Sequence, residues 1–429
     1  MKFLDIRDEN FESEFAAILA RGEETGKEVE AVVLDIIADV RKRGDAALIE
    51  YTEKYDRIRL DAGNLEITET EIDRAFSAAG VEEIEALSLA VERVRRFHGK
   101  QKHESWFSTD EPDVILGQMV RPLRKVGIYI PGGKASYPSS VIMNAVPAKV
   151  AGVDEVIMVV PAPGGEINPY VLAAASLSGV DRIFRIGGAQ AVAALAFGTE
   201  TVPKVDKITG PGNIYVATAK KLVFGRVGID MIAGPSEILV INDGSGDPRH
   251  IAADLLSQAE HDELASSILI TTDRCFGEQV AAEVEVQLEG LARQSIASRS
   301  WERYGAVIFA GDLDEAAEFS NRIAPEHLEL AVGKPFELLP KIRNAGAVFL
   351  GHFTPEAAGD YLAGPNHTLP TAGTARFFSP LSVDDFVKKS SVVYFSEDGL
   401  QRLGRSVAKI AELEGLQAHA RSVTVRIDR

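Results

Sequence analysis

The fold is decided by three related segments: GVDEVIMVVP at residues 152–161, GVDRIFRIGG at 179–188 and KVDKITGPG at 204–212. In each, a Val-Asp pair precedes an apolar, β-branched run. The aspartates of successive segments lie 27 and then 25 residues apart, which is the length of one strand-plus-helix unit. Repeated units of this length imply a parallel sheet with right-handed crossovers and with ligands at the carboxyl ends of its strands.

Glycine-rich loops follow three of the expected strands. They are Ile130-Pro131-Gly132-Gly133, Gly187-Gly188-Ala189-Gln190 and Gly210-Pro211-Gly212-Asn213. Main-chain amides at such helix starts bind phosphates, although a single loop of this type is more often a plain turn. The Gly-x-Gly-x-x-Gly dinucleotide fingerprint is absent from the sequence. A nucleotide bound at these loops is therefore expected to be held loosely.

Outward from this core, the sequence divides into four parts. Residues 1–105 form a helical N-terminal segment, and 106–240 form a first α/β module with the glycine loops. Residues 241–382 form a second α/β module with strand-like runs at 267–272, 306–310 and 345–350, and 383–429 form a small C-terminal unit. The expected fold class is α/β, with two Rossmann-like parallel-sheet modules that lack the usual fingerprint.

The composition excludes several function classes. The 429 residues carry 46 basic and 64 acidic side chains, a net charge of −18, which disfavours nucleic acid and anionic membrane surfaces as partners. No apolar run approaches the roughly 20 residues of a membrane span, and the polar start MKFLDIRDENFESEF is unlike a signal peptide. The single cysteine, Cys275, excludes an internal disulfide and a four-cysteine zinc site. These features predict a cytoplasmic protein.

Two segments contain pairs of residues suited to chemistry. In LLSQAEHDE, Gln258 and His261 are three residues apart and are expected to share a helix face. Together with carboxylates they would suit zinc or manganese, and a solvated helix end is the alternative. In IAPEHLEL, Glu326 and His327 offer two proton acceptors of different basicity, after Pro325 at an expected helix start. A surface pair is the alternative there.

Two further segments combine acids with histidine. Glu356 and Asp360, in TPEAAGDYLAGPNHTLP, are four residues apart and share a helix face, although surface carboxylates are the default interpretation. Glu414 and His419 precede a strand-like run in LEGLQAHARSVTVRI. The sequence contains no His-Glu-x-x-His and no Gly-x-Ser-x-Gly, which argues against a zincin peptidase and a serine hydrolase. The setting of Cys275 favours a structural cysteine over a nucleophile.

In this order, the segments resemble the histidinol dehydrogenase family. The matching stretches are VGIYIPGG, RIGGAQAVAALAFGT, KITGPGNIYV, DMIAGPSEILV, DLLSQAEHD, IAPEHLEL, AGDYLAGPNHTLPT, GTARFFSPLSV and EGLQAHARSVTVR. They extend from about Gly127 to Arg426, and the N-terminal segment resembles the family more loosely. The resemblance implies the last step of histidine biosynthesis, in which L-histidinol is oxidised to L-histidine through L-histidinal. It also implies two NAD molecules and one zinc ion per site.

The resemblance also implies roles for individual residues. The metal ligands would be Gln258, His261, Asp360 and His419, and the catalytic pair Glu326 and His327. The substrate contacts would be Ser236 and Glu414, together with His327 and the four metal ligands. The dinucleotide contacts would be Tyr129, Gln190 and Asn213, one at each glycine loop. The family is a homodimer with exchanged C-terminal segments, so Glu414 and His419 are expected to enter the site of the other subunit.

Three alternatives stay open. A related zinc- and NAD-dependent dehydrogenase for another polar alcohol, such as a sulfonated diol, would carry the same catalytic and metal residues; Glu414 and the GPNHTLPT loop favour histidinol. A non-catalytic binding protein on this scaffold would be expected to lose the acid–base pair, yet Glu326 and His327 are both present. A metal-dependent hydrolase would leave the dinucleotide-type loops unexplained, and turnover without NAD would identify it.

Overall fold

The structure, a computed structural model, describes residues 1–20, 27–132 and 136–428. It divides into two compact units: Met1–Gln101 with Leu123–Phe386, and Lys102–Pro122 with Val387–Arg429. The first unit contains two parallel sheets of five and six strands. These sheets confirm the α/β class that the repeated segments predict.

The repeated segments supply β5, β6 and β7, three of the five strands of the first sheet. Its strands are β4 (Lys125–Tyr129), β5 (Glu155–Val159), β6 (Arg182–Phe184), β7 (Lys207–Thr209) and β8 (Gly228–Ile229). They run parallel in the order β6-β5-β4-β7-β8. The order reverses between β4 and β7, and open parallel sheets bind ligands at such a switch point. The glycine loops follow β4, β6 and β7 as predicted, although Gly133 lies outside the described residues.

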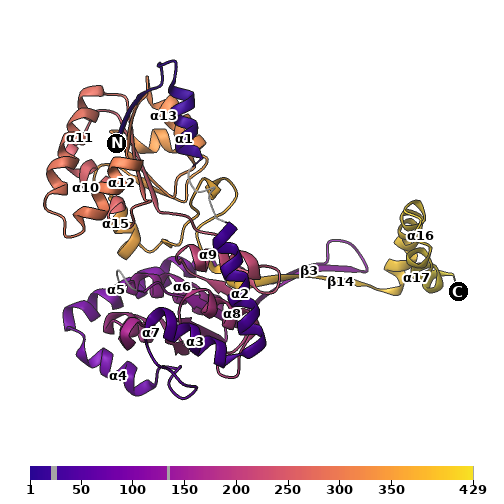
Figure 1. The fold of residues 1–429 in the computed structure, drawn as a ribbon. Helices are drawn as coiled ribbons and strands as arrows, with labels where there is room; N and C mark the ends of the chain where they lie inside the picture. Colours follow the sequence, from indigo (N-terminus) through magenta and orange to yellow (C-terminus); the bar gives the residue numbers. More distant parts are fainter. Residues whose placement is uncertain (21–26, 133–135, 429) are drawn as a thin grey trace. The chain divides into compact units, whose positions relative to one another are not determined.

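Helices cover both faces of this sheet (Figure 1). One face packs against α2 (Lys27–Arg43), α3 (Asp45–Asp56), α8 (Gly188–Phe197) and α9 (Ile214–Val223). The other packs against α4 (Glu69–Ala78), α5 (Val81–Gly99), α6 (Pro138–Ala151) and α7 (Pro169–Ser178). The strand side chains alternate between the two cores: Val159 of β5 joins the first, and Met158 joins the second. Helices α2 to α5 of the N-terminal segment therefore complete the first module.

The second sheet repeats the strand order of the first. Its strands are β9 (Glu237–Asn242), β10 (Ser266–Thr271), β11 (Ala306–Phe309), β12 (His327–Ala331), β13 (Ala347–Leu350) and β1 (Lys2–Asp5). They run parallel in the order β1-β11-β10-β9-β12-β13. When β1 is left out, the two strands that follow β9 in the chain lie on one side of it and the next two lie on the other side, as around β4 in the first sheet. The N-terminal segment, expected to be helical, thus begins with an edge strand.

The helices of the second sheet also lie on both faces (Figure 1). One face packs against α10 (Pro248–Ala259), α11 (Arg274–Leu288) and α12 (Gln294–Tyr304). The other packs against α1 (Phe11–Leu19), α13 (Leu313–Ile323) and α14 (Pro335–Leu338). Because every strand is covered on both faces, the polar groups of this module reach ligands mainly at the strand ends.

The second unit is an antiparallel sheet with two helices. The strands are β2 (Trp106–Ser108), β3 (Val114–Pro122) and β14 (Val387–Phe395), and the helices are α16 (Glu397–Leu413) and α17 (Gln417–Ile427). The strand-like run predicted after His419 is wrong, because this segment is part of α17. Val423 and Ile427, four residues apart, lie close to Gly404 of α16, and this packing favours the helix.

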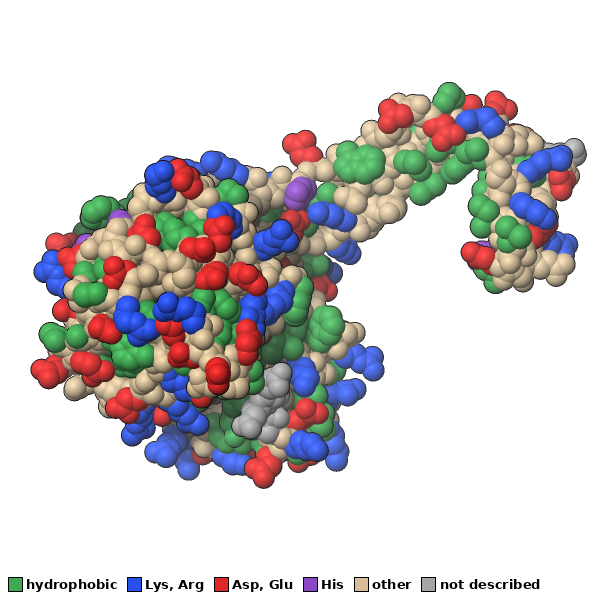
Figure 2. Space-filling model, turned by 90° about the horizontal axis from the view of Figure 1, so that it is seen from above, with side chains coloured by type: hydrophobic (Ala, Val, Ile, Leu, Met, Phe, Trp, Pro, Cys, Tyr) green, Lys and Arg blue, Asp and Glu red, His purple; other side chains and the backbone are tan. Residues whose placement is uncertain are grey.

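The surface carries charges of both signs. On the face of the first unit seen in Figure 2, acidic and basic side chains are interspersed rather than gathered into one basic patch. Across the described parts of the chain, none of the helices combines the length and the apolar character that a membrane span requires.

Candidate active site

Glu326 and His327 lie at the amino end of β12, in the interior of the second sheet. α13 ends at Ile323, and Ala324, in the left-handed region with a φ of 53°, turns the chain toward the strand. The predicted helix start at Pro325 is therefore wrong, since a proline just after a helix resembles one that opens a helix. Only 6% of Glu326 and 3% of His327 is exposed. The pair is buried and is not a surface pair.

The main chain of Glu237, the first residue of β9, contacts both members of the pair. Its N–H donates to Oε2 of Glu326 at 2.9 Å, and its carbonyl oxygen lies 3.0 Å from Nδ1 of His327. Because a carbonyl oxygen can only accept, Nδ1 carries the proton of the neutral ring. Nε2 is then the ring nitrogen that can accept a proton.

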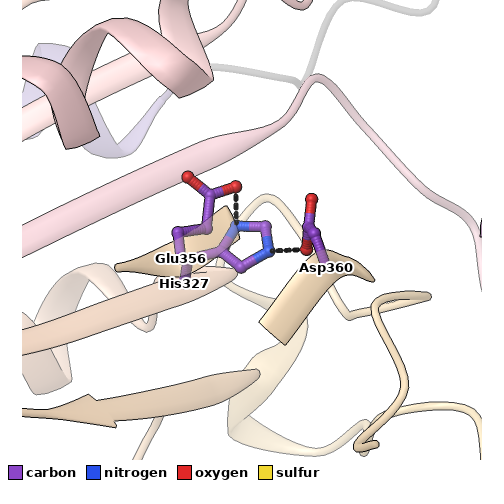
Figure 3. A group of neighbouring side chains, drawn as sticks. All are labelled: His327, Glu356 and Asp360. Atoms are coloured by element: carbon purple, nitrogen blue, oxygen red, sulfur yellow. Dashed lines mark ion pairs between the residues drawn. The ribbon is translucent and has the colours of Figure 1, made fainter. Parts of the chain in front are cut away.

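Two carboxylates flank the imidazole of His327 (Figure 3). Oε1 of Glu356 lies 3.7 Å from Nδ1, and Oδ1 of Asp360 lies 3.5 Å from Nε2. Both acids follow β13, in α15 (Glu356–Ala358) and in a π-helical turn over Gly359–Ala363. The N–H of Glu356 donates to Oε1 of Glu329 in β12 at 2.7 Å, which holds this segment against the strand.

Burial and neighbouring charges shift the pKa values of the pair. Burial raises the pKa of Glu326 to about 8, although His327 acts in the opposite direction. Burial alone would lower the pKa of His327, but Glu356 and Glu326 raise it well above its ordinary value. Two proton-binding groups therefore face each other in a low-dielectric setting, and a base with a pKa near the working pH is effective in proton transfer.

Further acids, Asp254 and Glu329, lie next to Glu356. Burial raises the pKa of Glu356 to about 7 and that of Asp254 to about 6. Burial, together with Asp254, raises the pKa of Glu329 well above its ordinary value. One imidazole does not neutralise so many carboxyl groups in a buried setting. Ligand atoms of His327, Glu356 and Asp360 all lie within 4.8 Å of one another, so the cluster fits a bound cation.

The end of α10 brings Gln258 and His261 to this cluster. Ser257 Oγ donates to Oε2 of Glu356 at 3.0 Å, and the N–H of His261 donates to the carbonyl oxygen of Gln258 at 3.2 Å. Oε1 of Gln258 is buried and has no hydrogen-bond partner among the described residues. Burial lowers the pKa of His261, and the nearby charge of Asp360 opposes that shift. An unpartnered carboxamide oxygen and a neutral imidazole are groups that a cation would engage.

The sequence assigns no role to Glu356 of the cluster or to His367, which lies near Asp360. Glu356 is 2% exposed, and its spacing of four residues from Asp360 was the available signal. Nε2 of His367 is buried without a hydrogen-bond partner among the described residues. Burial lowers the pKa of His367, and Asp360 acts in the opposite direction. The preceding Asn366 anchors this loop, because its Nδ2 donates to the carbonyl oxygen of Met143 in α6 at 2.6 Å.

Tyr129, Gln190 and Asn213 lie at strand ends of the first sheet. The hydroxyl of Tyr129, the last residue of β4, accepts from the N–H of Gly188 at 3.0 Å, and burial raises its pKa to about 12. Gln190 is buried in the first turn of α8. Oδ1 of Asn213 caps α9 by accepting from the N–H groups two and three residues further on. Its side-chain NH₂ is then the group that can donate to a ligand.

The remaining site candidates are Ser236, Glu414 and His419. Ser236 is half-buried directly before β9, beside the residue that holds the catalytic pair, and its carbonyl oxygen accepts from the N–H of Ser266 at 3.0 Å. Glu414 is the C-cap residue of α16, and His419 lies in α17; both are exposed. These two residues belong to the second unit, whereas all the other candidates belong to the first.

Comparisons with known proteins agree with one another. A family model described as histidinol dehydrogenase matches residues 19–427. Histidinol dehydrogenases from Geobacter metallireducens and Geobacter sulfurreducens are 79% and 78% identical over 428 residues, which is 100% of this chain and 98% and 100% of theirs. A crystal structure of histidinol dehydrogenase from Elizabethkingia anophelis matches with a TM-score of 0.94 at 40% identity, covering 100% of this chain and 98% of that one. The chain therefore belongs to the histidinol dehydrogenase family, the NAD-linked oxidoreductases of the last step of histidine biosynthesis.

Proposed function

We propose that the site around His327 oxidises L-histidinol to L-histidine through L-histidinal, with two NAD consumed per substrate. One observation carries this proposal: the buried pair of Glu326 and His327 is held on the main chain of Glu237. Oxidation of an alcohol to an acid needs one group that takes the alcohol proton and one that activates water. The pair supplies both groups next to a cluster suited to a metal.

We propose zinc as the metal, with Gln258, His261 and Asp360 as ligands and His419 as the fourth. The unpartnered Oε1 of Gln258 and the neutral imidazole of His261 support this set. A mixed set with a weak carboxamide ligand is unlike a closed structural site and suits an open one. When bound, zinc would hold the imidazole and amino group of the substrate and so position its alcohol carbon.

We propose that the dinucleotide binds at the carboxyl edge of the first sheet, with contacts at Tyr129, Gln190 and Asn213. The reversal of strand order between β4 and β7 and the helix starts of α8 and α9 support this location. NAD, when bound, supplies the hydride acceptor for both oxidations. Loose binding suits the exchange of NADH for NAD while the aldehyde stays in the site.

In the first oxidation, Nε2 of His327 takes the hydroxyl proton of L-histidinol as the hydride leaves the adjacent carbon. The N–H at Nδ1 keeps donating its hydrogen bond to the carbonyl oxygen of Glu237, so the ring keeps its orientation when it becomes an imidazolium. Glu356 lies close enough to stabilise that positive charge. Oδ1 of Asp360 lies 3.5 Å from Nε2, and engagement of that carboxylate by a metal would remove one of the three acidic charges that raise the pKa of His327.

In the second oxidation, Glu326 takes a proton from a water molecule, whose oxygen adds to the carbonyl carbon of L-histidinal. The imidazolium of His327 returns its proton to the carbonyl oxygen, and a gem-diol results. His327 is neutral again and takes one hydroxyl proton as the second hydride leaves, which yields the carboxylic acid. The protons then held by Glu326 and His327 pass to solvent when the product leaves, which regenerates both bases. The raised pKa of Glu326, about 8, makes its carboxylate a stronger base than an exposed one.

We further propose a cytoplasmic homodimer in which the second units are exchanged, so that Glu414 and His419 complete the site of the partner subunit. Apolar side chains on the surface of the second unit support this arrangement. They are Trp106, Phe107, Val393, Tyr394, Ile410 and Leu413. Exposed apolar patches of this kind mark protein–protein interfaces, and green side chains are visible on this unit in Figure 2. The acidic composition and the single cysteine suit the cytoplasm.

The stoichiometry of the reaction tests the proposed function. Limiting L-histidinol is supplied with excess NAD and zinc, and NADH and L-histidine are counted. We expect two NADH for each L-histidine formed. One NADH with accumulation of the aldehyde would contradict the four-electron oxidation. Product formation without NAD would point to a hydrolase, and faster turnover of a sulfonated diol would point to a related dehydrogenase.

A further inference from the structure

A buried ion pair lies behind the third glycine loop of the first module. Nζ of Lys220, in α9, lies 2.5 Å from Oδ1 of Asp230, the residue after β8. Only 3% of the Lys220 side chain and 1% of the Asp230 side chain is exposed. Lysine and aspartate are almost never fully buried unless they are paired. None of the proton transfers described above uses either residue.

Both members of the pair also bind the main chain of Gly210, the first residue of that loop. Nζ of Lys220 donates to the carbonyl oxygen of Gly210 at 2.8 Å. Oδ2 of Asp230 accepts from the N–H of the same glycine at 2.8 Å. The ion pair therefore satisfies both main-chain polar groups of a single residue, from α9 and from the residue that follows β8, the strand paired with β7.

Gly210 also meets a steric constraint from β4. Its φ of +111° lies in the region that favours glycine, and an added Cβ would collide with the carbonyl oxygen of Tyr129. The loop is thus confined at the switch point between β4 and β7. Asn213, three residues further on, caps α9.

We infer that Lys220 and Asp230 are positioning residues for the dinucleotide, which hold Gly210 and thereby set the place of Asn213. This inference rests on the proposed binding of NAD at this edge of the sheet. Apolar residues of similar size often match or exceed a buried ion pair in stability. Apolar residues, however, offer no donor to the carbonyl oxygen of Gly210 and no acceptor to its N–H. Loss of the pair therefore weakens dinucleotide binding selectively.

The test removes both charges together, in Lys220→Met/Asp230→Leu, so that neither is left buried and unpaired. We expect the KM for NAD and the Kd for NADH, from fluorescence titration of the holoenzyme, to rise about tenfold through misplacement of the loop. The KM for L-histidinol and the zinc content stay at the parent values. The control is Lys149→Met/Asp181→Leu, which removes a less buried 2.5 Å pair between the end of α6 and the residue before β6. It leaves dinucleotide affinity unchanged.

The inference is overturned if the double variant keeps the parent's KM for NAD and Kd for NADH. It is also overturned if the affinities for NAD, L-histidinol and zinc all fall by the same factor. If the double variant does not fold, Lys220→Arg is used, because it keeps the positive charge but moves the donor away from Gly210. An unchanged KM for NAD in Lys220→Arg would then overturn the inference. Asn213→Ala separates this inference from the proposed function. Loss of affinity in both variants supports the inference. Loss in Asn213→Ala alone keeps the proposed contact and overturns the inference, and loss in the double variant alone removes Asn213 as a contact and with it the route by which the ion pair is inferred to act. Loss in neither contradicts both.

Discussion

Nδ1 of His327 lies 3.0 Å from the main-chain carbonyl oxygen of Glu237, and this contact determines which ring nitrogen can accept a proton. The N–H of the same residue holds the carboxylate of Glu326 at 2.9 Å. The two proton-transfer groups are therefore supported independently of each other's side chain. Replacing one of them leaves the main-chain support of the other in place, but it removes the charge interaction across 3.8 Å by which each shifts the pKa of the other.

Replacement of His327 by asparagine should suppress both half-reactions, by about 10²- to 10⁴-fold, because each needs a proton acceptor at Nε2. Glu326→Gln keeps an oxygen for the N–H of Glu237 but loses the base, so it should slow mainly aldehyde hydration and the second oxidation. The measurement compares NADH formation from L-histidinol and from supplied L-histidinal. A normal rate of Glu326→Gln on L-histidinal would refute this division of roles.

Removal of a proposed zinc ligand should release the metal. In His261→Ala and His419→Ala, zinc affinity should fall about 10- to 100-fold or more, and zinc per subunit after dialysis should fall with it. His250→Ala, an exposed histidine on α10, is the control and should keep its zinc. Atomic absorption provides the measurement. Full zinc and full activity in His419→Ala would remove that residue from the ligand set.

Mixing two inactive variants tests the exchange of second units. If His261 and His419 of one site come from different subunits, a mixed dimer of His261→Ala and His419→Ala contains one intact site. Random pairing then restores about a quarter of the parent activity. His261→Ala mixed with Asp360→Ala is the control, since both residues belong to the first unit, and this mixture should stay inactive. No recovery in a confirmed mixed dimer of the first kind would rule out exchange.

Asp5 predicts a pH dependence of stability. A hydrogen bond from Arg7 holds the pKa of Asp5 well below its ordinary value, and Arg274 of α11 adds to that shift. Since the folded pKa is depressed, the carboxylate stabilises the fold above the unfolded pKa of about 4, and this contribution is lost as the pH falls further. Asp5→Asn should therefore unfold at lower urea than the parent at pH 7, with a difference that shrinks below about pH 4.

The control for Asp5 is Glu9→Gln, an exposed acid in the same segment, which should match the parent at both pH values. A urea difference between Asp5→Asn and the parent that stays constant from neutral to acid pH would show that the ionised carboxylate is not the cause.

The repeated Val-Asp segments were sufficient to predict β5, β6 and β7 of the first sheet, because each strand, loop and helix of a repeat is encoded within about 27 residues. The strand β1 could not be predicted from a local pattern of this kind. It pairs with β11, about 300 residues away, and nothing in the local pattern of Lys2–Asp5 distinguishes a strand there. Val423 and Ile427 are four residues apart, a spacing that puts two side chains on one face in a strand and in a helix alike. Their packing against Gly404 of α16 favours the helix.

The candidate site shows the same limit. The residue types at Glu326 and His327 indicated proton chemistry, but Pro325 placed them on the wrong element. Glu356 was assigned to the surface because most glutamates lie there. Its burial depends on contacts from α10 and β12, to Ser257 and Glu329, that no local spacing reveals.

The support of the catalytic pair by main-chain groups has an evolutionary consequence. Every residue type offers a carbonyl oxygen at position 237, and every type except proline offers an N–H. Mutations that change the side chain of Glu237 can therefore accumulate without turning the imidazole of His327 or releasing the carboxylate of Glu326. The side chain at position 237 accepts from the N–H of Ala372 and contributes to the raised pKa of Glu326. Substitutions there can therefore tune the basicity of Glu326 across generations while the orientation of both proton-transfer groups is inherited unchanged.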